Sequence, residues 1–191
     1  NEYLGFFQRP AASGNFAGVY DSAADEGLLR IYPANVARGV KIFAAGFQRA
    51  LDPQLWTDDG SSYVELHGGL EPTFDDWHEL GPGREVTWAE FWYPVAGLGG
   101  VTWADDAAAL YLAAAPGGQR VALAPTSALR GRLTVEVAGA APFTADVDMA
   151  PDRPFVGDVP LPAGAGGQTR VTLVDEVGRT VFQYTGQAAA P

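Results

Sequence analysis

Short apolar runs alternate with turn residues along the chain, and no segment keeps a helical repeat for long. The runs are rich in Val, Phe, Tyr and Trp and are bounded by Gly, Pro and Asp, which is typical of β-strands. In residues 1–106 the pattern predicts six strands: Tyr3–Gln8, Phe16–Tyr20, Leu28–Tyr32, Val40–Phe47, Ser62–Gly68 and Glu85–Pro94. Residues 41–47 (KIFAAGF) are apolar on both faces, which predicts a strand within the core.

Two local signals precede the sixth predicted strand. Gly81, Pro82 and Gly83 predict a type II turn, because Pro fits the first central position and Gly the second, where φ is positive. A short helix is also expected in this loop, because Thr73 can cap it and Asp76 can reach back to the capping residue.

The second part of the chain has evenly spaced strand signals. They predict seven strands: Ala109–Ala114, Arg120–Ala124, Arg132–Val137, Phe143–Asp148, Phe155–Val159, Arg170–Val174 and Thr180–Tyr184. Seven short strands in about 80 residues indicate an immunoglobulin-like or fibronectin-like β-sandwich. The last two strands are expected to form a hairpin with Gly178 in the left-handed region. The predicted fold class is therefore all-β.

Composition divides the chain at the same place as the strand pattern. Residues 1–106 contain 16 acidic and 6 basic side chains and all five Trp, whereas residues 107–191 contain 7 acidic and 6 basic ones. Because charge and aromatic content change together, we predict two domains, 1–106 and 107–191.

Charge and composition exclude several classes of function. The net charge of -11 argues against nucleic acid and anionic membrane surfaces as partners, because both need a basic face. There is no run of about 18 apolar residues and no Cys, so neither a membrane-spanning helix nor a Cys-ligated zinc site is expected. The pairs Asp58-Asp59 and Asp75-Asp76 lack the spacing of a calcium loop, and no cofactor-binding motif is present, so no metal and no cofactor are predicted. The compartment is left open.

The strand at residues 62–68 combines groups that can move a proton. Tyr63, Glu65 and His67 alternate with apolar residues and should therefore lie on one face. A carboxylate beside an imidazole can address one small ligand. The alternative is an ordinary solvent-facing strand surface.

The last strand predicted in residues 1–106 places a carboxylate between two indoles. Trp88, Glu90 and Trp92 are expected on one face, where sugar rings could stack on the indoles and sugar hydroxyls could bond to the carboxylate. The alternative is that these Trp are core residues. Trp56 and Trp77 lie beside the acidic pairs and complete the predicted carbohydrate-binding set, whereas His78 is expected to be simply solvated.

Residues 63–94, YVELHGGLEPTFDDWHELGPGREVTWAEFWYP, resemble the C-terminal part of a galactose mutarotase-like (aldose epimerase-like) domain. The shared features are a strand with a glutamate, a loop, the turn at residues 80–85 (LGPGRE) and a long strand. The upstream segments GNFAGVYD and LLRIYPANVARGVKIFAAGF are similar to an uncharacterised bacterial branch of that superfamily.

The resemblance implies a β-supersandwich, of which residues 1–106 would be the C-terminal portion, and implies a role for Glu65. In mutarotases the matching glutamate is the base that removes the anomeric hydroxyl proton, and its pKa must be raised modestly, which nearby Trp could cause. The partner acid is a histidine from the earlier half of that fold, and neither His67 nor His78 matches it. Since such a fold needs about 200–250 residues in one domain, we expect this sequence to be a piece of a larger protein.

Three hypotheses follow. The first is carbohydrate recognition without catalysis in this piece of the protein. The second is an aldose 1-epimerase-type enzyme with Glu65 as base and an acid supplied from outside the sequence. The third is a structural or docking module of a larger glycan-processing protein. An uncovered sheet edge would also allow self-association.

Overall fold

The computed structural model describes residues 4–7, 14–45, 57–61 and 63–188. The described residues form β-strands, turns and loops and no helix, so the prediction of an all-β fold is confirmed. Nothing in this part of the chain is a helix long and apolar enough to cross a membrane.

Two compact units make up the chain, and their sequences interleave. The first contains residues 1–18 and 30–91, and the second contains residues 19–29 and 92–191. The chain passes from one unit to the other after residues 18, 29 and 91, and all three positions lie inside strands. The domain boundary expected between residues 106 and 107 stays a prediction.

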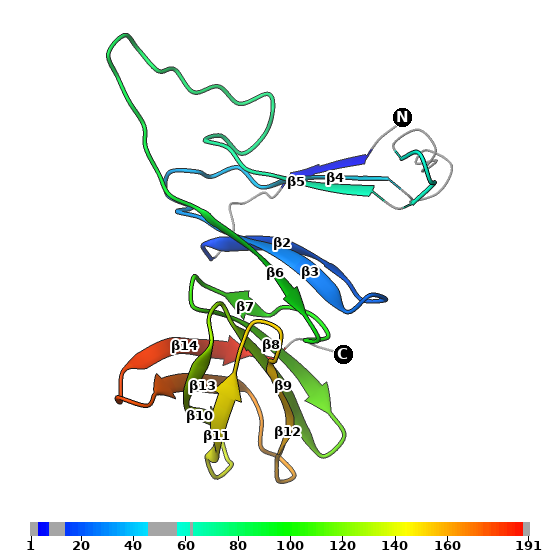
Figure 1. Cartoon of the computed structure of the whole chain (residues 1–191), viewed down its shortest axis with the longest axis vertical. Coiled ribbons are helices and arrows are strands. Elements are labelled where there is room, and N and C mark those ends of the chain that lie inside the picture. The colour runs from blue at the N-terminus through cyan, green and yellow to red at the C-terminus, as the bar shows by residue number, and fades with distance from the viewer. Residues whose placement is uncertain (1–3, 8–13, 46–56, 62, 189–191) are drawn as a thin grey trace. The chain divides into compact units, whose positions relative to one another are not determined.

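The first unit contains an antiparallel sheet in the order β1-β4-β5 (Figure 1). Its strands are β1 (Leu4–Phe7), β4 (Lys41–Ala45) and β5 (Tyr63–His67). Phe43 lies opposite Gly5 on one side and Glu65 on the other, and Lys41 lies opposite Phe7 and His67. Because directly opposed residues point to the same face of a sheet, all six side-chain positions share one face.

The sixth predicted strand is wrong over its first six residues. Strand β6 comprises Phe91–Ala96, and residues 84–90 form no strand. Trp88 and Glu90 therefore do not lie on a paired strand face with Trp92, since these residues find no neighbouring strand for their backbone groups in the described structure.

The predicted helix after Thr73 is also wrong, although its cap is present. The Thr73 N–H and hydroxyl both donate to Oδ2 of Asp76, at 3.0 and 2.8 Å, but the chain only bends there. Pro82 and Gly83 do form the predicted turn, with the Arg84 N–H donating to the Gly81 carbonyl at 3.1 Å and Gly83 at φ 73°. The capping motif bends the loop, but Pro72 before it and Gly81 and Pro82 beyond it leave little length for a helix.

Strands β2 (Phe16–Asp21), β3 (Glu26–Ile31) and β6 are hydrogen-bonded in the order β2-β3-β6. The first two match the predicted strands with ends shifted by one or two residues. A two-residue strand, β7 (Trp103–Ala104), was not predicted, because a segment so short has no readable alternation.

The second unit contains two four-stranded sheets, β12-β9-β8-β7 and β11-β10-β13-β14 (Figure 1). All seven predicted strands are present with slightly longer ends: β8 (Ala108–Ala115), β9 (Gly118–Pro125), β10 (Leu129–Val137), β11 (Phe143–Met149), β12 (Phe155–Pro160), β13 (Gln168–Asp175) and β14 (Thr180–Gln187). The hairpin β13–β14 closes as expected, with Gly178 at φ 84°. Whether this unit is immunoglobulin-like stays a prediction.

Each unit has its own apolar cluster. The cluster of the second unit takes residues from both of its sheets, among them Leu110, Leu123, Leu133 and Leu173, which are fully buried. Among the described residues of the first unit the buried members are fewer: Ala17, Tyr32, Ala37 and Val40, with Leu66 of β5 packed against them.

Candidate functional site

The three polar side chains of β5 meet on one face, as the alternation predicted. The Tyr63 hydroxyl donates to Oε1 of Glu65 at 2.5 Å, and Nε2 of His67 is hydrogen-bonded to Oε2. The side chains of Glu65 and His67 are 32% and 40% exposed. The result is a carboxylate oriented by two neighbours and still open to solvent.

The surroundings of Glu65 make it a weak base. The hydrogen bond from Tyr63, and then the one with His67, holds the pKa of the Glu65 carboxyl below its usual range. The same bond raises the pKa of the Tyr63 hydroxyl. The raised pKa expected of a mutarotase-type base is therefore absent here, because hydrogen bonding to the charged form outweighs burial.

Aromatic rings lie beside this carboxylate on the same face of the sheet. Phe74, from the loop after β5, stacks on Phe43 with ring centroids 5.4 Å apart and contacts Phe7 edge-on at 5.6 Å. Phe43 also meets the His67 ring edge-on at 5.6 Å. Gly5 leaves room for Phe43, since a Cβ there would lie 3.0 Å from the ring. We call Phe7, Phe43, Phe74 and His67 the aromatic cluster.

The sequence did not reveal Phe74 as part of the site. It lies in a loop, and no periodicity links it to β4, thirty residues earlier in the chain. Its ring is nevertheless 57% exposed, so one side of the aromatic cluster faces solvent.

Lys41 is a second residue that sequence reasoning missed. It is buried, and its Nζ lies 5.1 Å from the centroid of the Phe74 ring. Burial, and then the nearby charge of Arg30, lowers the pKa of the Lys41 amine, against an opposing effect of Asp76 and Glu71. The amine therefore places a hydrogen-bond donor beside the aromatic cluster.

Glu90, predicted as a sugar ligand, bonds to a buried arginine. The fully buried Arg30 donates from Nε and NH2 to Oε2 of Glu90, at 3.1 and 2.7 Å, and from NH1 to the Gly39 carbonyl at 2.8 Å. Trp88 Nε1 donates to the same oxygen at 3.2 Å. A Cβ at Gly68 would lie 2.4 Å from the guanidinium, so this position must stay a glycine for Arg30 to fit. This pair could not be predicted from local patterns, because its two members are 60 residues apart in the chain.

The remaining predicted Trp differ in their environments. Trp77 is almost fully exposed, at 93%, whereas Trp88 and Trp92 are near 40% exposed. Trp92 belongs to the second unit, and Trp56 lies outside the described residues.

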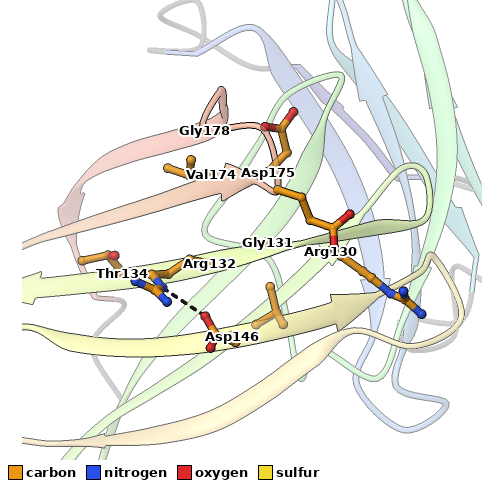
Figure 2. A pocket seen from close by; sticks show the side chains of 10 residues that line it. Arg130, Gly131, Arg132, Thr134, Asp146, Val174, Asp175 and Gly178 are labelled. Carbon is orange, nitrogen blue, oxygen red and sulfur yellow. Dashed lines mark hydrogen bonds and ion pairs between the residues drawn. The ribbon is translucent and has the colours of Figure 1, made fainter.

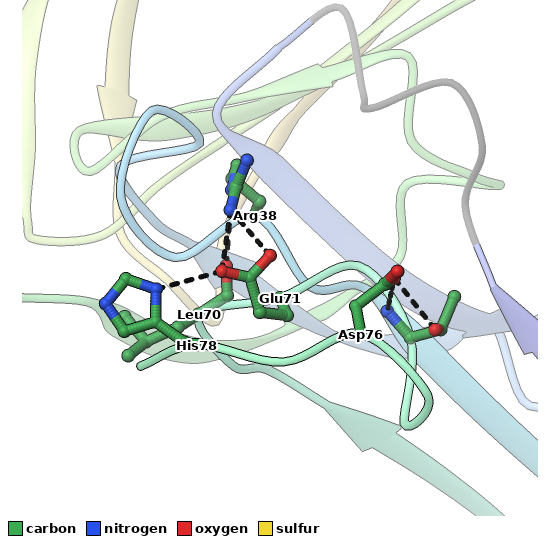
Figure 3. Close-up of polar contacts among 6 residues, drawn as sticks. Arg38, Leu70, Glu71, Asp76 and His78 are labelled. Carbon is green, nitrogen blue, oxygen red and sulfur yellow. Dashed lines mark hydrogen bonds and ion pairs between the residues drawn. The ribbon is translucent and has the colours of Figure 1, made fainter. Parts of the chain in front are cut away.

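The loop after β5 holds a further polar group (Figure 3). NH2 of Arg38 donates to both carboxylate oxygens of Glu71, and Nδ1 of His78 lies 2.9 Å from Oε1. These contacts, led by the one with His78, lower the pKa of Glu71. His78 was expected to be simply solvated, and that expectation is wrong because its ring is bonded to a carboxylate seven residues away.

A hollow of about 670 Å³ lies on the second unit, between β10, β11 and β13 (Figure 2). Arg132 points across it to Asp146, with Nε and Oδ1 3.0 Å apart, and both side chains are well exposed. None of the predicted site residues lies there. Among the described residues no group of three or more His, Asp or Glu is arranged to hold a metal ion.

Comparison with known proteins returns no match: no family model, no curated protein and no solved structure matches this chain. The resemblance to mutarotase-like domains therefore stays a prediction. The function of the chain has to be argued from the geometry of its own residues.

Proposed function

We propose that the first unit binds carbohydrate, without catalysis, on the face of sheet β1-β4-β5 that presents Tyr63, Glu65 and His67. The observation that supports this most is the partly exposed Glu65 carboxylate, bonded to both neighbours and bordered by the aromatic cluster. A sugar needs this combination, because its apolar ring face packs on aromatic carbon while its hydroxyls donate to a charged acceptor.

The available lone pairs leave capacity for a ligand. A carboxylate can accept about four hydrogen bonds, and Glu65 accepts two from the described residues. Phe74 offers an exposed ring beside it. Because Glu65 is already oriented, a sugar hydroxyl would bond to it without a large ordering cost.

The lowered pKa of Glu65 favours binding over catalysis. A general base works best with a pKa near the operating pH, and a depressed pKa weakens its pull on a hydroxyl proton. The epimerase alternative would need an added acid and a change in the Tyr63 and His67 contacts. Binding needs neither.

Binding is tested by titrating the chain with mono- and oligosaccharides while following Trp fluorescence and calorimetry. Glu65→Gln should weaken binding by roughly 10- to 100-fold, the value of a hydrogen bond to a charged group. Asp75→Asn removes one charge from an exposed position of the neighbouring loop and is the matched control. A flat response of the wild-type chain across a broad panel would leave only the docking alternative.

Polarimetry of a fresh aldose solution tests the non-catalytic part of the proposal. The chain should leave the rate of anomerisation at its spontaneous value. Acceleration by the wild-type chain that falls roughly a hundredfold in Glu65→Gln would instead make the protein an epimerase.

The docking alternative rests on the opposite face of the same sheet. Phe6 of β1 and Val64 of β5 point there and are 53% and 47% exposed. Of the described strands, only β4 pairs with β5 or β1, so the outer edge of each could pair with another chain. Light scattering over a concentration series should show self-association that Val64→Lys reduces. If the molar mass of the wild-type chain and that of Val64→Lys both stay constant over the concentration series, this alternative is excluded.

A further inference from the structure

His78 is held by a bonded carboxylate on the loop after β5. Glu71 accepts two hydrogen bonds from Arg38, at 2.7 and 2.5 Å, and its side chain is only 13% exposed. His78 Nδ1 lies 2.9 Å from Oε1 of this carboxylate (Figure 3). Because an ionised carboxylate only accepts hydrogen bonds, Nδ1 carries the proton.

The other ring nitrogen is then the accepting one. In the neutral ring, a proton on Nδ1 leaves the lone pair on Nε2. No group in the described part of the chain bonds to Nε2, and the side chain is 38% exposed. Glu71 thus orients His78 so that Nε2 is the acceptor. Carboxylates fix the tautomer of many metal-binding histidines in the same way.

His78 borders a hollow of about 440 Å³ that continues along the loop to residue 86. Glu79, Arg84 and Glu85 line it together with the apolar Leu80 and Val86. Within the described residues the three charged side chains make no ion pair. The wall therefore offers acceptors, one cationic donor and apolar carbon.

This mixture fits one class of ligand best. The carboxylates of Glu79 and Glu85 would repel an anion, and the guanidinium of Arg84 would repel a simple cation. A polyol satisfies all the groups, since its hydroxyls donate to imidazole and carboxylates and accept from Arg84, while its C–H face contacts Leu80.

We propose that residues 78–86 form a second saccharide subsite, in which Nε2 of His78 accepts a hydrogen bond from a sugar hydroxyl. This inference rests on the proposed carbohydrate binding but uses different residues. Glu71 is a positioning residue, because it acts on the ligand only through His78.

The chain contains only two histidines, one at each site, and they report the sites separately. Long-range ¹H–¹⁵N spectra of the whole chain resolve the two rings, which His67→Gln and His78→Gln assign. The probes are galactose, glucose, xylose and cellotetraose, added at pH 7.5. At pH 7.5 the Nε2 signal of His78 should move with added sugar, and His78→Gln should weaken cellotetraose binding about tenfold, the value of one hydrogen bond.

The outcomes distinguish this inference from the proposed function. Movement of both histidine signals supports both sites, and movement of His78 alone supports the subsite while overturning binding at Glu65. Movement of His67 alone, or of neither, overturns the subsite. Glu71→Gln should let the His78 signal lose its single-tautomer pattern and weaken the sugar response, whereas Asp75→Asn should change neither. An unaltered His78 signal in Glu71→Gln would overturn the positioning role.

Discussion

The sheet β1-β4-β5 of the first unit and the paired sheets of the second unit bury their side chains to different extents. In the second unit fourteen buried residues from both sheets form one apolar cluster. Among the described residues of the first unit the corresponding cluster has four buried members, and Phe7, Phe74 and Val64 of the sheet region are well exposed. Among the described residues, apolar side chains are therefore buried far more extensively in the second unit than in the first.

The first unit compensates with buried polar contacts. Arg30 is completely buried, and its bonds to Glu90 and to the Gly39 carbonyl connect three segments of that unit. In the second unit the arginines lie outside, in exposed pairs such as Arg132 with Asp146. Among the described residues, the unit with the smaller apolar cluster is also the one that exposes the aromatic side chains Phe7, Phe74 and Trp77.

The largest effect is expected from a cavity in the second unit. Leu133→Ala should reduce its free energy of unfolding by about 2–5 kcal/mol, because the side chain is fully buried between two sheets. Hydrogen exchange measured by mass spectrometry on peptides of β9 and β10 would show it. Val40→Ala, in the small cluster, should cost less and affect only peptides of the first unit. If Leu133→Ala and Val40→Ala lost the same free energy of unfolding, the difference in apolar burial between the two units would be contradicted.

The next effect is expected at Arg30. Arg30→Met should cost the first unit about 3 kcal/mol, because removing one partner leaves a partly buried carboxylate without its cation. Hydrogen exchange in residues 63–91 reports it. Arg132→Met is the matched control, since it breaks an exposed pair and should cost less than about 1 kcal/mol. If the two substitutions cost the same, Arg30 is not the support proposed for this unit.

A smaller effect is expected at Gly68. Gly68→Ala should cost about 1–3 kcal/mol, because the new methyl group would lie 2.4 Å from the Arg30 guanidinium and displace it. Thermal unfolding followed by Trp fluorescence measures the loss. Gly81→Ala, where the new Cβ would lie 3.9 Å from the side chain of Arg84 and φ is ordinary, should be close to neutral. A neutral Gly68→Ala would show that Arg30 can move at little cost.

The smallest effect concerns the titration of Glu65. Its carboxyl carbon, followed by NMR, should titrate below the ordinary value, and Tyr63→Phe should raise the midpoint because it removes the larger of the two hydrogen-bond contributions. The folded pKa is depressed, so this contribution to stability is present above the unfolded pKa of about 4.3 and is lost as the pH falls through the folded value. An unchanged midpoint in Tyr63→Phe would assign the shift to another cause.

Strand positions were largely predictable, because alternation and turn residues are local signals. The seven strands of the second unit and the Gly178 hairpin appear where expected. Tyr63, Glu65 and His67 also share one face of β5, as predicted. The failures have physical reasons. Residues 84–90 have strand-forming side chains but no partner strand, and the Thr73 cap forms without a helix behind it.

The local sequence pattern thus decided which residues form strands and on which face of β5 the Glu65 carboxylate lies, because both follow from a two-residue repeat of apolar and polar positions. Folding in three dimensions decided what each charged group touches. Arg30 reaches Glu90 across 60 residues, Phe74 meets Phe43 across 31, and Glu71 orients His78 through a bend that no periodicity encodes. Contacts at such separations depend on the packing of whole segments, and a short window of sequence contains no record of them.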